Sequence, residues 1–233
     1  MSEKRVQLFT SMQVWYHKHI LHFMMFFIIT GLPLVSVYFS FIAYLIGVPF
    51  SLGAGSTSSE VLVTGIQMCR IIHRVSAVLW LLVSIPFIFT MLPKIRNWGI
   101  TPKLRKGQGI IDYVKEGLAD NKRIYIDWQY PENMGKYSFL QIVAAWAVII
   151  VCILMIVSGI VLWFRQSFSI DTAAFMRVVH FAGFVVIGLF LIFHIYFAIL
   201  PANRAGYKAM FGDGTDSEEH ARKKHPGLFS KES

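Results

Sequence analysis

The sequence has 233 residues, of which 55% are hydrophobic, 15% aromatic and only 15% charged, with a mean hydropathy of +0.56. Soluble domains carry about a quarter charged residues, and the apolar residues here gather in four long blocks. The composition therefore excludes an ordinary soluble domain and predicts an integral membrane protein. The formal net charge of +9 is explained by membrane topology, so a nucleic-acid partner is not needed.

The first apolar block runs from about Ile20 to Val48 and is interrupted by Gly31-Leu32-Pro33. About 20 helical residues cross the ~30 Å apolar core of a bilayer, so we expect one long, kinked transmembrane helix over residues 17–48. The Gly/Ser/Thr-rich stretch 51–59 that follows is typical of an exposed loop. The polar segment before the block lacks the features of a cleaved signal peptide, so we expect the first helix to be retained.

Three further blocks predict transmembrane helices at about residues 70–93, 137–165 and 172–200. The segment 94–136 is too charged to insert, and aliphatic residues at helical spacing predict a short helix at 110–118 within it. In the polar tail, 201–233, Thr215 or Asp216 could cap a helix with an acidic first turn and a basic last turn. The expected fold is an all-α membrane protein, a single four-transmembrane-helix bundle.

The basic residues predict the orientation of the bundle. Eighteen of the 22 Lys and Arg residues lie in the N-terminal segment, the 94–136 loop and the tail. Because positive charge is retained on the cytoplasmic side, both termini and the loop are expected in the cytoplasm. The two cysteines, Cys69 and Cys152, form no Cys-x-x-Cys-His motif. They predict neither a disulfide framework nor a covalently attached haem, and are expected to be small packing residues.

Histidines inside membrane segments are costly and mark functional sites. His180 and His194 lie fourteen residues apart on the fourth predicted helix. At ~100° and ~1.5 Å per residue they share one face and lie roughly 21 Å apart along the axis. One would therefore lie near each side of the apolar core, as two cofactors at opposite membrane surfaces require.

Partner histidines exist at matching depths for both members of this pair. His73 begins the second predicted helix, level with His180, while the first helix offers His17, His19 and His22 opposite His194. Two six-coordinate b-type haems would satisfy this pattern; a histidine proton relay or helix-bridging histidines are the alternatives. Three neighbouring arginines, Arg70, Arg74 and Arg177, could neutralise haem propionates or simply anchor the helices at the interface. Three single glycines, Gly31, Gly159 and Gly183, could let a porphyrin approach the backbone. His220 and His225 lie in the tail and are expected to be solvated.

Taken together, these motifs resemble the cytochrome b (gamma) subunit of respiratory formate dehydrogenases, within the wider dihaem family that includes b-type cytochromes of nickel–iron hydrogenases. The resemblance covers nearly the whole chain. It rests on the following features: His17 fourteen residues before Gly31, the Arg70-Ile-Ile-His73 motif, the His180/His194 spacing, Gly135-Lys-Tyr137 before the third helix, and the tail motifs Gly206–Gly212 and Glu219–Pro226. The tail favours the formate dehydrogenase branch.

The resemblance implies that His73 and His180 bind an outer haem, and His17 and His194 an inner one. It also implies a menaquinone or ubiquinone site near the start of the third helix, with Tyr137, Ser138 and Gln141 as candidate residues. Here Ser138 stands where the family has Asn, and Leu140 where it has Gly. The histidine-rich first helix leaves His19 and His22 open as alternatives to His17.

The resulting interpretation is a multi-pass subunit of the prokaryotic cytoplasmic (inner) membrane that passes electrons between an iron–sulfur partner subunit and quinone. A separate catalytic subunit on the outer face is implied, since no catalytic residues are visible in this chain. A hydrogenase or reductase-type cytochrome b would use the same helices. A haem-free anchor and a histidine-based proton-relay transporter are the alternatives from other classes; the second expects acidic residues in the four helix cores, which contain none.

Overall fold

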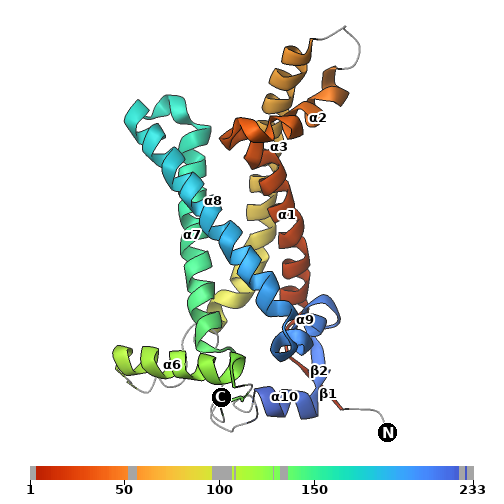
Figure 1. Ribbon diagram of the computed structural model, residues 1–233, viewed down its shortest axis with the longest axis vertical. Coiled ribbons are helices and arrows are strands. Elements are labelled where there is room, and N and C mark those ends of the chain that lie inside the picture. Colours follow the sequence, from red (N-terminus) through yellow and green to blue (C-terminus); the bar gives the residue numbers. More distant parts are fainter. Residues whose placement is uncertain are drawn as a thin grey trace. The chain divides into compact units, whose positions relative to one another are not determined.

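The computed structural model describes residues 4–51, 57–95, 107, 109–127, 129–131, 136–225 and 229. The chain divides into two compact units. One unit is Thr10–Met91, and the other combines the N-terminal residues Met1–Phe9 with Leu92–Ser233. Figure 1 shows that helices dominate the described residues of both units.

Four described helices are long and apolar enough to cross a membrane. They are α1 (Ser11–Val35), α3 (Ser58–Met91), α7 (Phe139–Trp163) and α8 (Ile170–Ile199). The predicted all-α membrane fold with four spans is thereby confirmed. We refer to α1 and α3 as the first pair and to α7 and α8 as the second pair. The side of the membrane that holds the termini stays a prediction.

The first apolar block is two helices, so the prediction of one kinked helix over residues 17–48 is wrong. α1 starts earlier than expected and continues through Pro33 to Val35, where Ser36 is extended (φ −143°, ψ 136°). The Ser36 hydroxyl accepts a hydrogen bond from the Tyr38 N–H at 3.3 Å. Ser36 is thereby the N-cap of the 3₁₀ turn η1 (Val37–Phe39), which is followed by α2 (Ser40–Ser51). Because the extended Ser36 satisfies a backbone N–H at the start of the next turn, one helix ends there and another begins.

α2 packs on α3 with their backbones in direct contact. A Cβ added at Gly65 would lie 1.7 Å from the Ala43 carbonyl oxygen, and one added at Gly47 would lie 2.1 Å from that of Val61. Only glycine permits such an approach. This contact involves the first part of α3, which begins twelve residues before the expected start at residue 70. The predicted 51–59 loop is correspondingly shorter, because its first residue ends α2 and its last two begin α3; residues 52–56 lie outside the described part.

The spans of the second unit agree with the predicted boundaries to within two residues. α7 and α8 are joined by the 3₁₀ turn η3 (Arg165–Ser167), and α8 begins after Ser169, whose hydroxyl accepts from the Thr172 N–H at 3.1 Å. The predicted loop helix is confirmed as α6 (Ile110–Tyr125), which runs seven residues further than expected. α6 packs on the start of α7, where a Cβ at Gly117 would lie 2.3 Å from the Phe139 ring.

The tail folds back on the N-terminal segment. It contains the 3₁₀ turn η4 (Pro201–Asn203), α9 (Arg204–Phe211), β2 (Thr215–Ser217) and α10 (Glu218–Lys224). β2 pairs antiparallel with β1 (Arg5–Gln7), which the sequence did not predict. The acidic-to-basic tail helix is confirmed, but its cap is Ser217, the last residue of β2, whose hydroxyl accepts from the His220 N–H at 3.3 Å. Burial lowers the pKa of Lys224 to about 8, and its ammonium donates to the Ala202 carbonyl.

Candidate functional site

His73 in α3 is held by a hydroxyl on α1. Its Nδ1 lies 2.9 Å from Thr30 Oγ1, and the same hydroxyl donates to the Phe26 carbonyl at 2.6 Å. Because the single hydroxyl proton is used on that carbonyl, Nδ1 must carry a hydrogen and donate it to Thr30. The lone pair of the imidazole is then on Nε2, which is the form that can bind a metal ion.

His180 in α8 has the same arrangement with α7. Its Nδ1 lies 2.9 Å from Ser158 Oγ, and Ser158 Oγ donates to the Leu154 carbonyl at 2.6 Å. Because the single Ser158 hydroxyl proton is used on that carbonyl, His180 Nδ1 carries a hydrogen and the lone pair is on Nε2. Two helix pairs from distant parts of the chain therefore prepare one histidine each in the same tautomer.

A glycine follows each of these hydroxyl residues. A Cβ added at Gly31 would lie 3.5 Å from His73 Cε1, and one added at Gly159 would lie 3.5 Å from His180 Cε1. Each imidazole therefore lies directly against the backbone of the neighbouring helix. Of the three glycines expected to make room near a cofactor, the remaining one, Gly183, instead faces Met155 within the second pair.

An arginine also precedes each histidine by three residues, one helical turn earlier. Arg70 precedes His73 and Arg177 precedes His180, and both arginine side chains are exposed. The third predicted arginine, Arg74, adjoins His73 and is half-buried. His73 itself lies well inside α3 rather than at its beginning, because the helix starts at Ser58.

The candidate inner histidines have a different environment. α8 is continuous from Ile170 to Ile199, so the predicted separation of roughly 21 Å along the axis applies to His180 and His194. The His194 ring stacks on Phe190, with ring centres 5.2 Å apart. The structure brings the predicted pair onto one unbroken helix.

The three histidines of α1 differ in their contacts. His19 Nδ1 lies 2.8 Å from the Trp15 carbonyl, and His22 Nδ1 lies 2.9 Å from the Lys18 carbonyl. Since a carbonyl only accepts, both rings donate from Nδ1 and carry the lone pair on Nε2. His17 is half-buried and His22 is exposed. These contacts leave Nε2 of His19 and His22 chemically able to bind a metal.

The predicted quinone residues lie at the start of α7. Ser138 caps the helix: its N–H donates to Gln141 Oε1 at 2.8 Å, and its hydroxyl accepts from the Gln141 N–H at 3.4 Å. These two residues therefore have a structural role, a reciprocal capping box. Tyr137 precedes them beside Lys136, whose ammonium lies 5.3 Å from the tyrosine ring centre. Burial, and to a smaller extent the positive charge of Lys94, lowers the pKa of Lys136.

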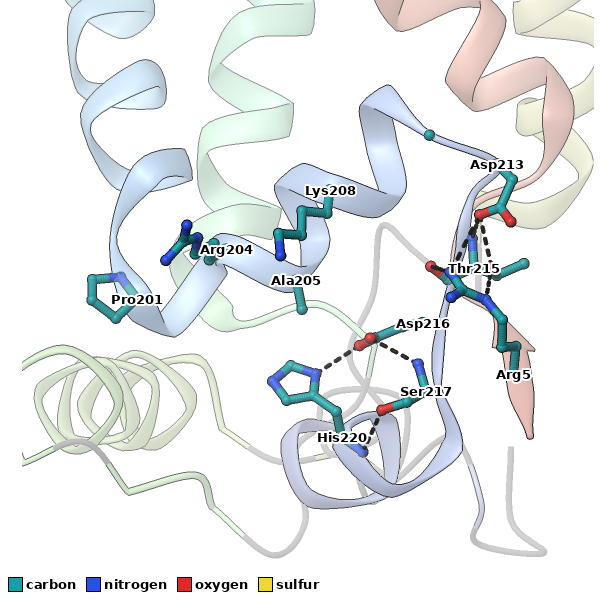
Figure 2. A pocket seen from close by; sticks show the side chains of 11 residues that line it. Arg5, Pro201, Arg204, Ala205, Lys208, Asp213, Thr215, Asp216, Ser217 and His220 are labelled. Carbon is teal, nitrogen blue, oxygen red and sulfur yellow. Dashed lines mark hydrogen bonds and ion pairs between the residues drawn. The ribbon is translucent and has the colours of Figure 1, made fainter. Parts of the chain in front are cut away.

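A separate cavity of about 790 Å³ lies in the tail region of the second unit. Figure 2 shows its polar lining, in which Arg5 donates to Thr215 Oγ1 at 2.7 Å and His220 pairs with Asp216 at 2.6 Å. Arg204 and Lys208 of α9 also line it. The cavity contains none of the histidines expected to bind haem.

Sequence reasoning missed Thr30 and Ser158 as partners of the histidines. The signal was present: each is twenty residues after the N-cap of its helix, Thr10 or Ser138. Each cap is followed three residues later by glutamine, and each hydroxyl residue is followed directly by glycine. Comparing α1 with α7 in this way reveals the repeat without coordinates.

The family model described as prokaryotic cytochrome b561 matches residues 9–213. The cytochrome b556(fdo) subunit of formate dehydrogenase from Escherichia coli strain K12 is 32% identical over 100 residues, which cover 42% of this chain and 46% of that protein. The subunits of the same name from E. coli O6:H1 and O157:H7 match equally. The match thus spans less than half the length of these curated relatives.

Proposed function

The chain belongs to the prokaryotic cytochrome b561 family, and from that premise we propose that it is a dihaem b-type cytochrome that carries electrons between an iron–sulfur subunit and the quinone pool. It is a multi-pass membrane cytochrome related to the cytochrome b subunit of formate dehydrogenase. Membership of the family implies b-type haem. The number of haems, their ligands and the electron partners are the proposal.

The observation that carries the proposal is the pair of hydroxyl–imidazole contacts. Two buried hydroxyls, one in each helix pair, hold His73 and His180 with the lone pair on Nε2. Histidines that bind haem iron need this tautomer, and a partner at Nδ1 orients the ring. The donor set of two neutral imidazoles fits a six-coordinate haem b. We therefore propose that the two histidines are the axial ligands of the outer haem.

For the inner haem we propose His194 and His17, with His19 and His22 as the alternatives on α1. The unbroken α8 supports this assignment, because it gives His180 and His194 a common face and a rise suited to two stacked sites across the membrane. The arginines Arg70, Arg74 and Arg177 are proposed partners of the propionates, since guanidinium groups pair well with carboxylates.

The chain's contribution to electron transfer is ligation, spacing and surrounding charge. When bound, haem b supplies a one-electron couple whose potential depends on its ligands and their hydrogen bonds. The quinone site is proposed near Tyr137, Ser138 and Gln141 at the cytoplasmic end. The helix cap uses Ser138 Oγ and Gln141 Oε1 as acceptors, so the hydroxyls of Tyr137 and Ser138 and the amide NH2 of Gln141 are the proposed donors to a quinone carbonyl.

The partner proposal comes from the relatives, whose names place them in formate dehydrogenase. We propose that this chain likewise anchors an iron–sulfur subunit and a catalytic subunit on the outer face of the membrane. Affinity purification from the native membrane, followed by identification of the co-purifying subunits, tests this assignment. Recovery of a hydrogenase or reductase-type catalytic subunit would replace the formate dehydrogenase assignment.

The dihaem proposal is tested on the purified full chain. A pyridine haemochrome assay is expected to give two haem b per chain, and a redox titration two components. Reduction by a quinol analogue, slowed in Tyr137→Phe, is expected to support the quinone site. Absence of haem b from protein made in haem-competent cells would refute the proposal and leave the haem-free anchor or the proton relay.

A further inference from the structure

The two hydroxyl–imidazole contacts have the same geometry in both helix pairs. In each, the hydroxyl lies 2.9 Å from histidine Nδ1 and 2.6 Å from the carbonyl four residues earlier. We propose that Thr30 and Ser158 are positioning residues of the outer haem, which fix the tautomer of its two ligands and lower its reduction potential. The inference rests on the proposed function, in which His73 and His180 bind that haem.

Burial makes these hydrogen bonds durable. Thr30 is 1% exposed and Ser158 is fully buried, so water does not compete for either hydroxyl. A buried hydroxyl is costly unless it is fully bonded. Here each donates to a carbonyl and accepts from an imidazole. Rotating the histidine ring or moving its proton to Nε2 would therefore break a buried hydrogen bond, which is costly.

The contact to histidine is more specific than ordinary back-bonding within a helix. Serine and threonine often donate to the carbonyl four residues earlier, as buried Ser84 does to Trp80 at 2.7 Å. Ser84, however, contacts Tyr16 OH at 2.9 Å rather than a histidine. Among the described residues, a glycine whose Cβ position lies 3.5 Å from a histidine ring follows the hydroxyl residue at Thr30 and at Ser158, whereas Ser84 is followed by Ile85. The same combination of hydroxyl, histidine and glycine therefore occurs once in each helix pair.

The electronic consequence has a definite sign. An Nδ1–H that donates a hydrogen bond makes Nε2 a more basic ligand. A more basic ligand stabilises ferric iron more than ferrous iron, so the hydrogen bond lowers the reduction potential. Removing either hydroxyl is therefore expected to move the potential of the outer haem to a more positive value.

The inner haem provides an internal control in the same molecule. Its proposed ligands are thirteen residues from Thr30 along α1 and fourteen residues from His180 along α8. These intervals correspond to roughly 20 Å of helix. A substitution that acts only through the Nδ1 contact should leave the inner potential unchanged.

The test uses the full chain with its haems. Thr30→Val keeps the side-chain shape and removes the hydroxyl, and Ser158→Ala removes the other. Both variants are expected to retain two haem b by the pyridine haemochrome assay. In a potentiometric titration the same one of the two components should move to a more positive potential in each variant, and further in the double variant. Thr30→Ser, which retains the hydroxyl, should restore the original potential.

Ser84→Ala is the matched control, since it removes a buried, back-bonded hydroxyl that touches no histidine; it should leave the outer component unchanged. An unshifted outer component in Thr30→Val or Ser158→Ala, or shifts in different components, would overturn the inference. If Thr30→Val loses the outer haem while Thr30→Ser keeps it, the positioning role is supported; loss in both overturns it. Failure of the proposed function itself is distinct, because the unmodified protein would then lack haem b.

Discussion

The first pair (α1 and α3) and the second pair (α7 and α8) start alike and then diverge. α1 and α7 each have 25 residues and each begin with a capping box, Thr10 with Gln13 and Ser138 with Gln141. Twenty residues after the cap, a buried hydroxyl holds a histidine of the following span. At this level the two pairs are equivalent, which suits two ligands of one haem.

Fourteen residues beyond these histidines the pairs differ. The second pair has His194 there, whereas the first pair has Phe87, whose ring stacks on Tyr16 with centres 4.0 Å apart. The first pair instead carries its further histidines on α1. The comparison indicates that the two proposed ligands of the outer haem are held in equivalent ways, whereas the proposed ligands of the inner haem occupy non-equivalent positions in the two pairs.

The largest expected effect comes from His73 and His180, the two histidines that are held in the same way in the two pairs. His73→Ala and His180→Ala should each remove the same haem component and lower the haem content by half, because a six-coordinate site needs both ligands. Haem content and redox titration measure this. His220→Ala, which alters a tail histidine paired with Asp216, should keep both haems. Loss of different components in the two variants would break the equivalence.

The next largest effect is expected at the proposed inner haem, whose ligands occupy non-equivalent positions in the two pairs. His194→Ala should remove the other haem, and of the three histidines on α1 only His17→Ala should do the same. His19 and His22 are the alternative ligands, and they lie two and five residues after His17 on the same helix, so their replacement is a close control. The same haem assay decides: a loss confined to His19→Ala or His22→Ala would move the ligand to that residue.

A further contrast concerns the helix contacts. Gly65→Ala should destabilise the first pair by about 1–3 kcal/mol, the usual cost of overpacking, because its Cβ would lie 1.7 Å from a backbone oxygen of α2. Gly188→Ala in α8 is the matched control, because the added Cβ would meet no atom within 4 Å apart from the adjacent backbone of its own helix. Thermal unfolding in detergent should show a lower Tm only for the first variant; equal Tm values would contradict the close contact.

The smallest effect is expected at the helix caps. Thr10→Ala and Ser138→Ala should each cost about 1 kcal/mol, typical for loss of an N-cap. Equal losses measured by chemical unfolding would confirm that the two caps are equivalent. If Ser138→Ala also slows haem reduction by a quinol analogue while Thr10→Ala does not, Ser138 serves the quinone as well as the helix.

The sequence by itself determined the four spans, since hydropathy depends only on neighbouring residues, and it placed His180 and His194 on one face, since helix pitch is constant. It could not show the β1–β2 pairing or the shortened 51–59 loop, because each depends on partners distant in the chain. The break at Ser36 was missed although its cap, the Ser36 hydroxyl with the Tyr38 N–H, is local. The capping role of Ser138 and Gln141 was readable from their spacing. Only the tertiary structure brought Thr30 to His73 and Ser158 to His180, because those contacts require two helices to pack at one depth and rotation.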